Sequence, residues 1–176
     1  DEKSIATLKA HLGKIEDSLT RALCWSAAWD MLRDAEISAS DFIEIALAGL
    51  PGEDDIATVT IIANQLVTAV ELYSAPTKRD SARLKVGNAY EQMLKASAAG
   101  SDHQLQFARN FTSFAASAEH NDLIKELLDG KLSGLKVDAD LRWTFVIALA
   151  ERGLMDKSAL ATELLKDNTL TGSLSH

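Results

Sequence analysis

The sequence is poor in residues that crosslink a chain or interrupt helices. Among its 176 residues there are one cysteine, Cys24, two prolines and nine glycines, and aromatic residues make up only 6%. A single cysteine excludes an internal disulfide and a cluster of thiolate metal ligands. The scarcity of turn-forming and aromatic residues disfavours a β-sandwich, which needs many of both.

Basic residues are also fewer than acidic ones. The chain has 18 lysines and arginines against 26 aspartates and glutamates, which gives a net charge of −8. A surface of that charge repels phosphate, so a nucleic-acid partner is not expected. The apolar fraction of 47% is nevertheless enough to build a folded core.

The sequence has no long uninterrupted apolar run. The longest extends from Phe145 to Ala150, well short of the roughly 20 residues that cross a bilayer. The first residues, Asp1 to Ser4, are acidic and polar, unlike a secretion signal. These absences predict a cytoplasmic chain with no membrane partner.

Helical periodicity runs through most of the chain, whereas strand-like alternation is almost absent. We therefore expect about eight or nine helices and no strand. The expected helices cover residues 17–34, 38–48, 54–73, 76–95, 102–117, 121–130, 138–153 and 158–166. In these, Ser38 and Asp41 match a capping box, Asn121 is an expected N-cap, and Asp138 or Asp140 begins the next helix. Residues 167–176 lack an apolar period and are predicted to be a frayed tail.

The first of these helices is apolar on two sides. One stripe consists of Leu19, Leu23 and Ala27, and the other of Trp25, Ala28, Trp29 and Leu32. A helix apolar on two sides is expected to pack on both. By similar reasoning, the segment 56–70 has no charged residue and is expected to form an inner helix.

Two short segments of the chain are similar to each other. Residues 42–49 and 123–130 match in their apolar positions and in their final glycine, at a constant offset of 81 residues. Half of that offset is about 40 residues, the usual length of a HEAT-type helix pair. The sequence therefore predicts an all-α fold, a right-handed superhelix of antiparallel HEAT-like helix pairs, forming a single domain over residues 1–176.

A search for a metal or catalytic site finds no suitable constellation. A zinc peptidase helix needs two histidines one turn apart with a glutamate beside the first. The four histidines are His11, His103, His120 and His176. No two are four residues apart, so they are interpreted as solvated or capping side chains. No catalytic residue and no metal ligand are predicted.

Other reactive or charged side chains have structural interpretations. Cys24 lies on an apolar helix, which predicts a buried and inert thiol. The acidic runs 53–55 and 138–140 are interpreted as helix starts, because negative charge is favoured there. All three tryptophans are interpreted as core. Arg142 has two open interpretations, pairing with nearby acids or contact with a ligand carboxylate, and is the one candidate substrate-facing residue.

Two stretches resemble a known family. The first runs from Ala22 to Met31 and continues in residues 33–36 and 41–42. The second is Asp140-Leu141-Arg142-Trp143, which follows a Gly134-Leu135 loop. Together they resemble the C-terminal helical (HEAT-like) domain of bacterial aminopeptidase N of the actinobacterial type, which belongs to the gluzincin zinc metalloaminopeptidases. The expected helices also follow one another in the same order as in that family, over nearly the whole chain.

The resemblance implies a role in a larger enzyme. Members of the family have an N-terminal β-domain, a thermolysin-like catalytic domain and a C-terminal helical domain that covers the active site and limits which peptides enter. Zinc is bound in the catalytic domain by HExxH and a downstream glutamate, and a GxMEN loop binds the peptide's amino terminus. None of these motifs occurs in this chain. The resemblance therefore implies no cofactor in this chain and zinc in its parent.

Two functions are carried forward from the sequence. In the first, the chain is a fragment of a zinc aminopeptidase, without activity of its own, whose partners are the catalytic domain of the same parent chain and the peptide substrate. In the second, it is a free-standing HEAT-like scaffold that binds a protein partner. An HExxH motif upstream of Asp1 in the parent gene would favour the first.

Overall fold

The computed structural model describes residues 2–166, and within this range every regular element is helical. The prediction of an all-α chain is thereby confirmed. The chain divides into two compact units, Asp1–Ala89 and Tyr90–His176. The superhelix and the single domain stay predictions, and the predicted frayed tail, 167–176, lies outside the described residues.

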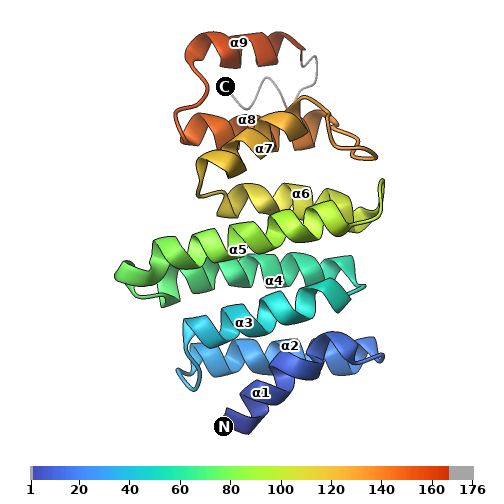
Figure 1. Cartoon of the computed structure of the whole chain (residues 1–176), viewed down its shortest axis with the longest axis vertical. Coiled ribbons are helices and arrows are strands. Elements are labelled where there is room, and N and C mark those ends of the chain that lie inside the picture. The colour runs from blue at the N-terminus through green and yellow to red at the C-terminus, as the bar shows by residue number, and fades with distance from the viewer. Residues whose placement is uncertain (1, 167–176) are drawn as a thin grey trace. The chain divides into compact units, whose positions relative to one another are not determined.

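The first unit contains four complete α-helices and the start of a fifth. Their bounds are α1 Glu2–His11, α2 Ser18–Arg33, α3 Ala39–Gly49, α4 Ile56–Thr68 and α5 Pro76–Ala96, the last of which continues into the second unit. Short 3₁₀ turns at Leu12–Lys14 and Leu50–Gly52 and a π-helix at Ala69–Tyr73 complete it. Helix α3 is central, because it packs against α1, α2 and α4 (Figure 1).

Acidic and hydroxyl side chains fix where these helices begin. Ser38 accepts a hydrogen bond from the Asp41 N–H while Asp41 accepts from the Ser38 N–H, so the predicted capping box is confirmed. Asp17 and Asp55 accept N–H bonds at the starts of α2 and α4 in the same way. Each cap satisfies a backbone donor that has no partner inside the helix.

Helix α2 is packed on one side, not two. Trp25, Ala28 and Leu32 are buried as expected, but Leu19 is 67% exposed and Leu23 is 63% exposed. The two-sided prediction was wrong because neighbouring helices cover only the face that contains Trp25. The other stripe, Leu19, Leu23 and Ala27, is an exposed apolar strip on the surface of the first unit.

Helix α4 and the π-helix after it form the most apolar run. Ile56–Tyr73 is long and apolar enough to cross a membrane by length and composition, with a mean hydropathy of 1.4, and 33% of it is buried within the protein. It is the one such run among residues 2–166. Its buried residues, Val59, Ile62, Ala63 and Leu66, lie on one face of α4, and Ile61 is exposed. About a third of this run is therefore buried in the first unit, and the absence of a membrane partner stays a prediction.

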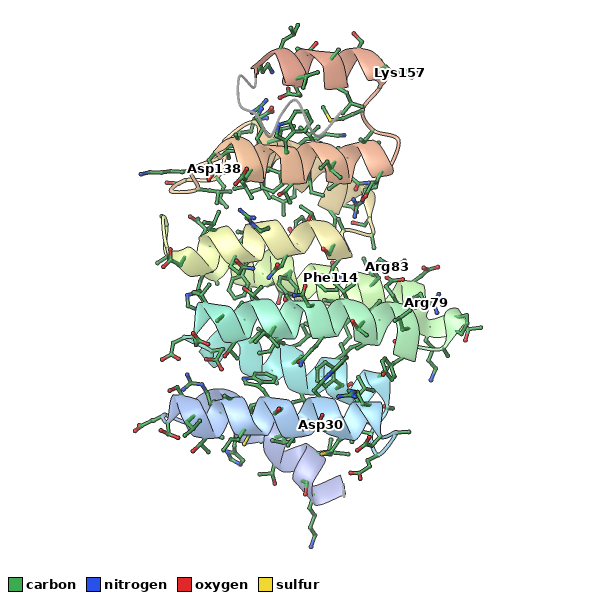
Figure 2. All side chains as sticks on the ribbon, turned by 180° about the vertical axis from the view of Figure 1, so that it is seen from behind. Asp30, Arg79, Arg83, Phe114, Asp138 and Lys157 are labelled. Atoms are coloured by element: carbon green, nitrogen blue, oxygen red, sulfur yellow. The ribbon has the colours of Figure 1, made fainter. Side chains whose placement is uncertain are left out.

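The second unit is built around α8. Its helices are α6 Asp102–Phe114, α7 Ala118–Leu128, α8 Ala139–Glu151 and α9 Lys157–Lys166, and α8 packs against the other three (Figure 1). Asp138 is the N-cap of α8 and Phe114 ends α6, as the labels in Figure 2 show. Phe107, Phe111 and Phe114 of α6 are buried.

One predicted boundary in this unit is wrong. The cap of α7 is Ser117, whose hydroxyl accepts from the His120 N–H, and not Asn121. The preceding helix ends at Phe114 because Ala115 adopts an extended conformation. Serine at a cap competes with the backbone for hydrogen bonds, so a helix start can occur inside an otherwise continuous periodic pattern.

The two similar segments form α3 and α7 but end differently. Gly49 is the last residue of α3 and has right-handed helical dihedrals. Glycine fits there because a side chain would meet the Trp25 ring. Gly130 follows α7 with φ of +70°, the left-handed conformation that favours glycine at a helix end. The matching glycines therefore have different physical roles, and a repeat is not needed to explain them.

Candidate functional site

No metal-binding group is found within residues 2–166: no three His, Cys, Asp or Glu side chains are close enough together to bind one ion. Of the histidines described, His11 is exposed and His103 is partly buried. His120 is only 1% exposed, so of its two interpretations, solvated or capping, the solvated one is wrong. Its Nδ1 accepts the Ala116 N–H at 3.1 Å.

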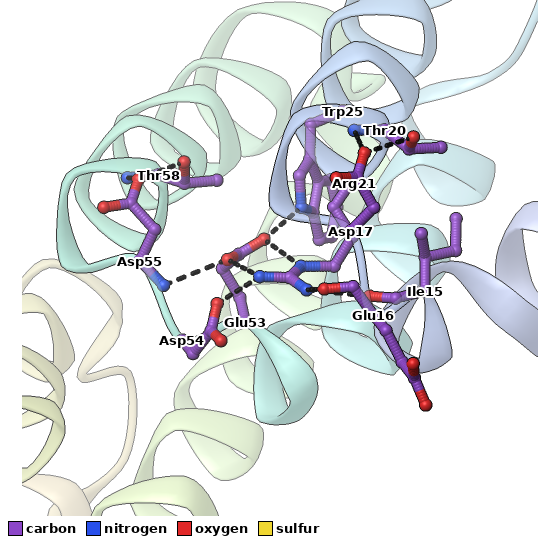
Figure 3. Close-up of polar contacts among 10 residues, drawn as sticks. All are labelled: Ile15, Glu16, Asp17, Thr20, Arg21, Trp25, Glu53, Asp54, Asp55 and Thr58. Carbon is purple, nitrogen blue, oxygen red and sulfur yellow. Dashed lines mark hydrogen bonds and ion pairs between the residues drawn. The ribbon is translucent and has the colours of Figure 1, made fainter.

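The most extensive polar cluster joins α2 to the loop before α4 (Figure 3). The Arg21 and Glu53 side chains are each 3% exposed. Arg21 Nε donates to Glu53 Oε2 at 3.2 Å and Arg21 Nη2 to Glu53 Oε1 at 3.0 Å, a two-pronged ion pair. Arg21 Nη2 also pairs with Asp54, and Nη1 donates to the carbonyls of Ile15 and Glu16.

Glu53 is ionised in this cluster despite its burial. Burial raises the pKa of the Glu53 carboxyl, but hydrogen bonds from Arg21, the Asp55 N–H and the Trp25 indole outweigh it and leave the pKa lowered. Each carboxylate oxygen has two donors: Oε1 accepts from Arg21 and the Asp55 N–H, and Oε2 from Arg21 and Trp25. Neither oxygen is left free for a substrate, so the cluster is a structural tie.

Sequence reasoning missed this cluster. It placed Glu53 at a helix start, whereas only Asp55 caps α4 and Glu53 is buried against α2. A signal was present, because Arg21 precedes Trp25 by four residues and so continues the buried stripe of α2. An arginine within an apolar stripe requires a buried acceptor, but spacing does not show which acid supplies it.

Arg142 is paired with Glu163. Its Nε donates to Glu163 Oε2 at 2.6 Å and its Nη1 donates to the Leu128 carbonyl at 3.3 Å. Glu163 also accepts from Lys166 at 2.8 Å. The side chain thus connects α8 to the end of α7 and to α9, and its proposed contact with substrate stays a prediction.

A second arginine in this unit ties helix ends together. Arg152 Nη2 donates to the carbonyls of Thr112, at 2.7 Å, and Ala115, at 3.1 Å, while Nη1 donates to Ala148 at 2.6 Å. Carbonyls at helix ends have no partner within their helix. Arg152 supplies donors to the ends of both α6 and α8.

The remaining candidates are only partly as expected. Trp25 and Trp143 are core residues, at 4% and 8% exposure, whereas Trp29 is partly buried. Cys24 is also partly exposed, which corrects the prediction of a buried thiol. Cys24 lies on α2 between the buried stripe that contains Trp25 and the exposed stripe that contains Leu23. The prediction that α2 is packed on both sides would have buried it.

The first unit contains a cavity of about 570 Å³. It lies between the segment that joins α2 to α3 and the first three turns of α5. The cavity is lined by Leu32, Ala35, Ile37, Ser38, Ala39, Ser40, Ile43, Tyr73, Ser74, Ala75, Lys78, Ser81, Ala82 and Lys85. Two of these residues are basic and none is acidic.

Comparison with known proteins agrees with the resemblance seen in the sequence. Residues 1–175 match the family described as the ERAP1-like C-terminal domain. The chain is 43% identical over 174 residues to aminopeptidase N of Streptomyces lividans, and this alignment covers 98% of the chain and 20% of that relative. The chain thus spans about a fifth of the length of the relative that it matches. The predicted relation to a C-terminal domain of bacterial aminopeptidase N is confirmed.

Proposed function

The chain belongs to the ERAP1-like C-terminal domain family, and from this premise we propose that it is a non-catalytic helical domain of a cytoplasmic zinc aminopeptidase. The parent enzyme would remove N-terminal amino acids from peptides. This chain would form part of the wall that covers the substrate chamber and limits which peptides enter. The observation that supports the proposal is 43% identity to an aminopeptidase N across 98% of the chain.

This chain would contribute the shape of the substrate chamber and no catalytic group. The zinc of the parent would be bound elsewhere in the polypeptide, because residues 2–166 offer no group of three suitable ligands. Buried ties such as Arg21–Glu53, and the carbonyl contacts of Arg152, keep helix ends fixed within each unit. A wall fixed in this way excludes peptides by shape. The net charge of −8 would favour the cationic amino terminus of a peptide.

Activity of the chain alone and of its parent tests the proposal. We expect the 176-residue chain to hydrolyse no aminoacyl chromogenic substrate above a blank when zinc is added, while the full-length polypeptide is active. Turnover by the chain alone would contradict the non-catalytic role. A parent gene without an upstream HExxH motif would instead favour the free-standing scaffold.

Arg142 allows a test of the substrate-facing role in the full-length enzyme. If Arg142 contacts substrate, Arg142→Ala should raise KM for a ten-residue peptide and leave kcat for a single-residue chromogenic substrate unchanged. The matched control is Glu163→Gln, which weakens the ion pair but keeps the arginine. Equal effects of the two substitutions on the peptide KM would assign Arg142 a structural role only.

A further inference from the structure

The cavity in the first unit is positively charged although the chain is acidic. Lys78 and Lys85 lie two turns apart on one face of α5, with Ser81 and Ala82 between them, and all four line the cavity. No aspartate or glutamate is among the lining residues. A cavity without carboxylates is unexpected in a chain with 26 acidic residues and 18 basic ones.

Glu36, between the lining residues Ala35 and Ile37, is exposed, whereas the acids next to Ser40 and Ile43, Asp41 and Glu44, are paired with a third lysine. Lys9 pairs with Asp41 at 3.1 Å and with Glu44 at 2.7 Å. Lys85 shares Glu44, at 3.2 Å, and uses one of its three donors there. Within the described residues Lys78 has no ion-pair partner, and it is exposed, so its charge is unpaired but solvated.

The charge of Arg83 on α5 is neutralised away from the cavity. Arg83, labelled in Figure 2, forms a two-pronged pair with Glu71 and a further pair with Asp80. None of these three residues lines the cavity. The unpaired charge at the cavity is therefore that of Lys78, with a smaller contribution from Lys85.

The opposite wall is apolar and the rim is rich in hydroxyl groups. Leu32, Ile37 and Ile43 line the cavity but are only 3%, 6% and 2% exposed, so its accessible apolar surface comes mainly from Tyr73, which is 44% exposed, and from the lining alanines. Four serines, at positions 38, 40, 74 and 81, lie around it. The volume is within the range of about 300–1,000 Å³ that is usual for small-molecule sites. Its chemistry suits a ligand with one anionic end and an apolar body.

We propose that this cavity binds a small amphipathic carboxylate, with its carboxylate on Lys78 and its apolar body against Tyr73 and the alanines that line the cavity. The argument for this site does not rest on the proposed peptidase function, because it uses only the residues that line the cavity. A charge-assisted hydrogen bond to an ammonium is stronger than a neutral one, so the charge of the ligand should control affinity.

Titration of the 176-residue chain with matched probes tests the proposal. The probes are 4-phenylbutyrate, the neutral 4-phenylbutan-1-ol, the cationic 4-phenylbutylamine and inorganic phosphate, followed by amide chemical shifts. We expect saturable shifts at residues 35–40 and 74–85 with the carboxylate, about tenfold weaker binding of the alcohol, and none with the amine or phosphate. Equal affinity for acid and alcohol, or saturation by phosphate, would overturn the proposal.

Amino-acid substitutions test separately the two lysines and the apolar part of the cavity. Lys78→Gln should weaken carboxylate binding about tenfold, and Lys85→Gln should weaken it less because Lys85 is shared with Glu44. Ala82→Leu should reduce binding by filling the cavity without changing its charge. The matched control is Lys125→Gln, which alters an exposed ion pair with Asp122 in the other unit. An unchanged affinity in both Lys78→Gln and Ala82→Leu, with folding confirmed by the amide spectrum, would contradict the site.

Discussion

At the scale of single residues, the Arg21–Glu53 pair has the largest expected effect on stability. Removing one partner of a buried ion pair leaves an uncompensated charge, which costs about 3–5 kcal/mol. Glu53→Gln should therefore lower the free energy of unfolding by about 3 kcal/mol, measured by urea denaturation. The glutamine would leave Arg21 charged within a site that is 3% exposed.

Asp54 provides the matched control for Glu53. It pairs with the same arginine, but its side chain is 78% exposed. Exposed pairs contribute less than about 1 kcal/mol, so Asp54→Asn should have only a small effect. If the two substitutions cost the same, burial would not be the reason that the pair matters.

His120 should make the stability of the second unit depend on pH. Burial lowers its pKa below the ordinary value of 6.5, and the opposing charges of Glu91 and Glu119 do not restore it. The unfolded chain binds a proton below about pH 6.5 that the folded chain does not, so stability falls as the pH is lowered from there. The loss cannot exceed about 1.4 kcal/mol per pH unit for one proton.

Replacement of His120 by asparagine tests that dependence. An asparagine carbonyl can accept the Ala116 N–H that Nδ1 accepts now, and it does not titrate. We expect melting temperatures at about pH 7.5 and pH 5.5 to differ less in His120→Asn than in the original chain. Identical pH dependence in both proteins would show that another group is responsible.

At the scale of the helix, the end of α2 uses an unfavourable residue. Glu36 N–H donates to the Met31 carbonyl and Ala35 N–H to Leu32, the hydrogen bonds of a Schellman motif. The residue in the left-handed conformation is Ala35, with φ of +59°, where glycine is usual. Ala35→Gly should therefore stabilise the protein by about 1 kcal/mol.

A glycine elsewhere in the same helix is the control. Ala22 is an exposed residue in the middle of α2, where glycine costs about 1 kcal/mol relative to alanine. Ala35→Gly and Ala22→Gly should shift the urea midpoint in opposite directions. A loss of stability in both would mean that the α2 end does not strain Ala35.

The elements differ in how far sequence could predict them. The capping box of Ser38 and Asp41 and the cap at Asp138 were predictable, because each involves residues three apart. The Arg21–Glu53 tie spans 32 residues, and no local pattern specifies which acid an arginine will meet. The exposed side of α2 was missed for a related reason: an apolar stripe indicates what a helix can bury, not how many neighbours will cover it.

At the scale of the whole molecule, ionised carboxylates should determine stability in acid. Within residues 2–166, seven carboxyl groups have pKa values below their ordinary ones: Asp17, Asp41, Glu44, Glu53, Asp55, Glu119 and Glu163. A lowered pKa adds stability above the unfolded-state pKa, and this stability is lost as the pH falls through the folded-state value. The urea midpoint should therefore decrease steeply between about pH 5 and pH 3.

The Glu53→Gln variant is the internal reference for that experiment. With one of the seven groups removed, its midpoint should fall less over the same pH range, although it begins lower. A midpoint that stays constant down to about pH 3 would show that the carboxylates are not ionised in the contacts described here.

The π-helix at Ala69–Tyr73 has an implication for related genes. A π turn contains one residue more than the α turn that it replaces, so deleting a single residue there would leave a regular helix. Most length differences among homologues fall in surface loops. Among homologues we expect some members to lack one codon within this helix, and in those members the residues that follow it would keep their positions, because the wider turn is what absorbs the extra residue.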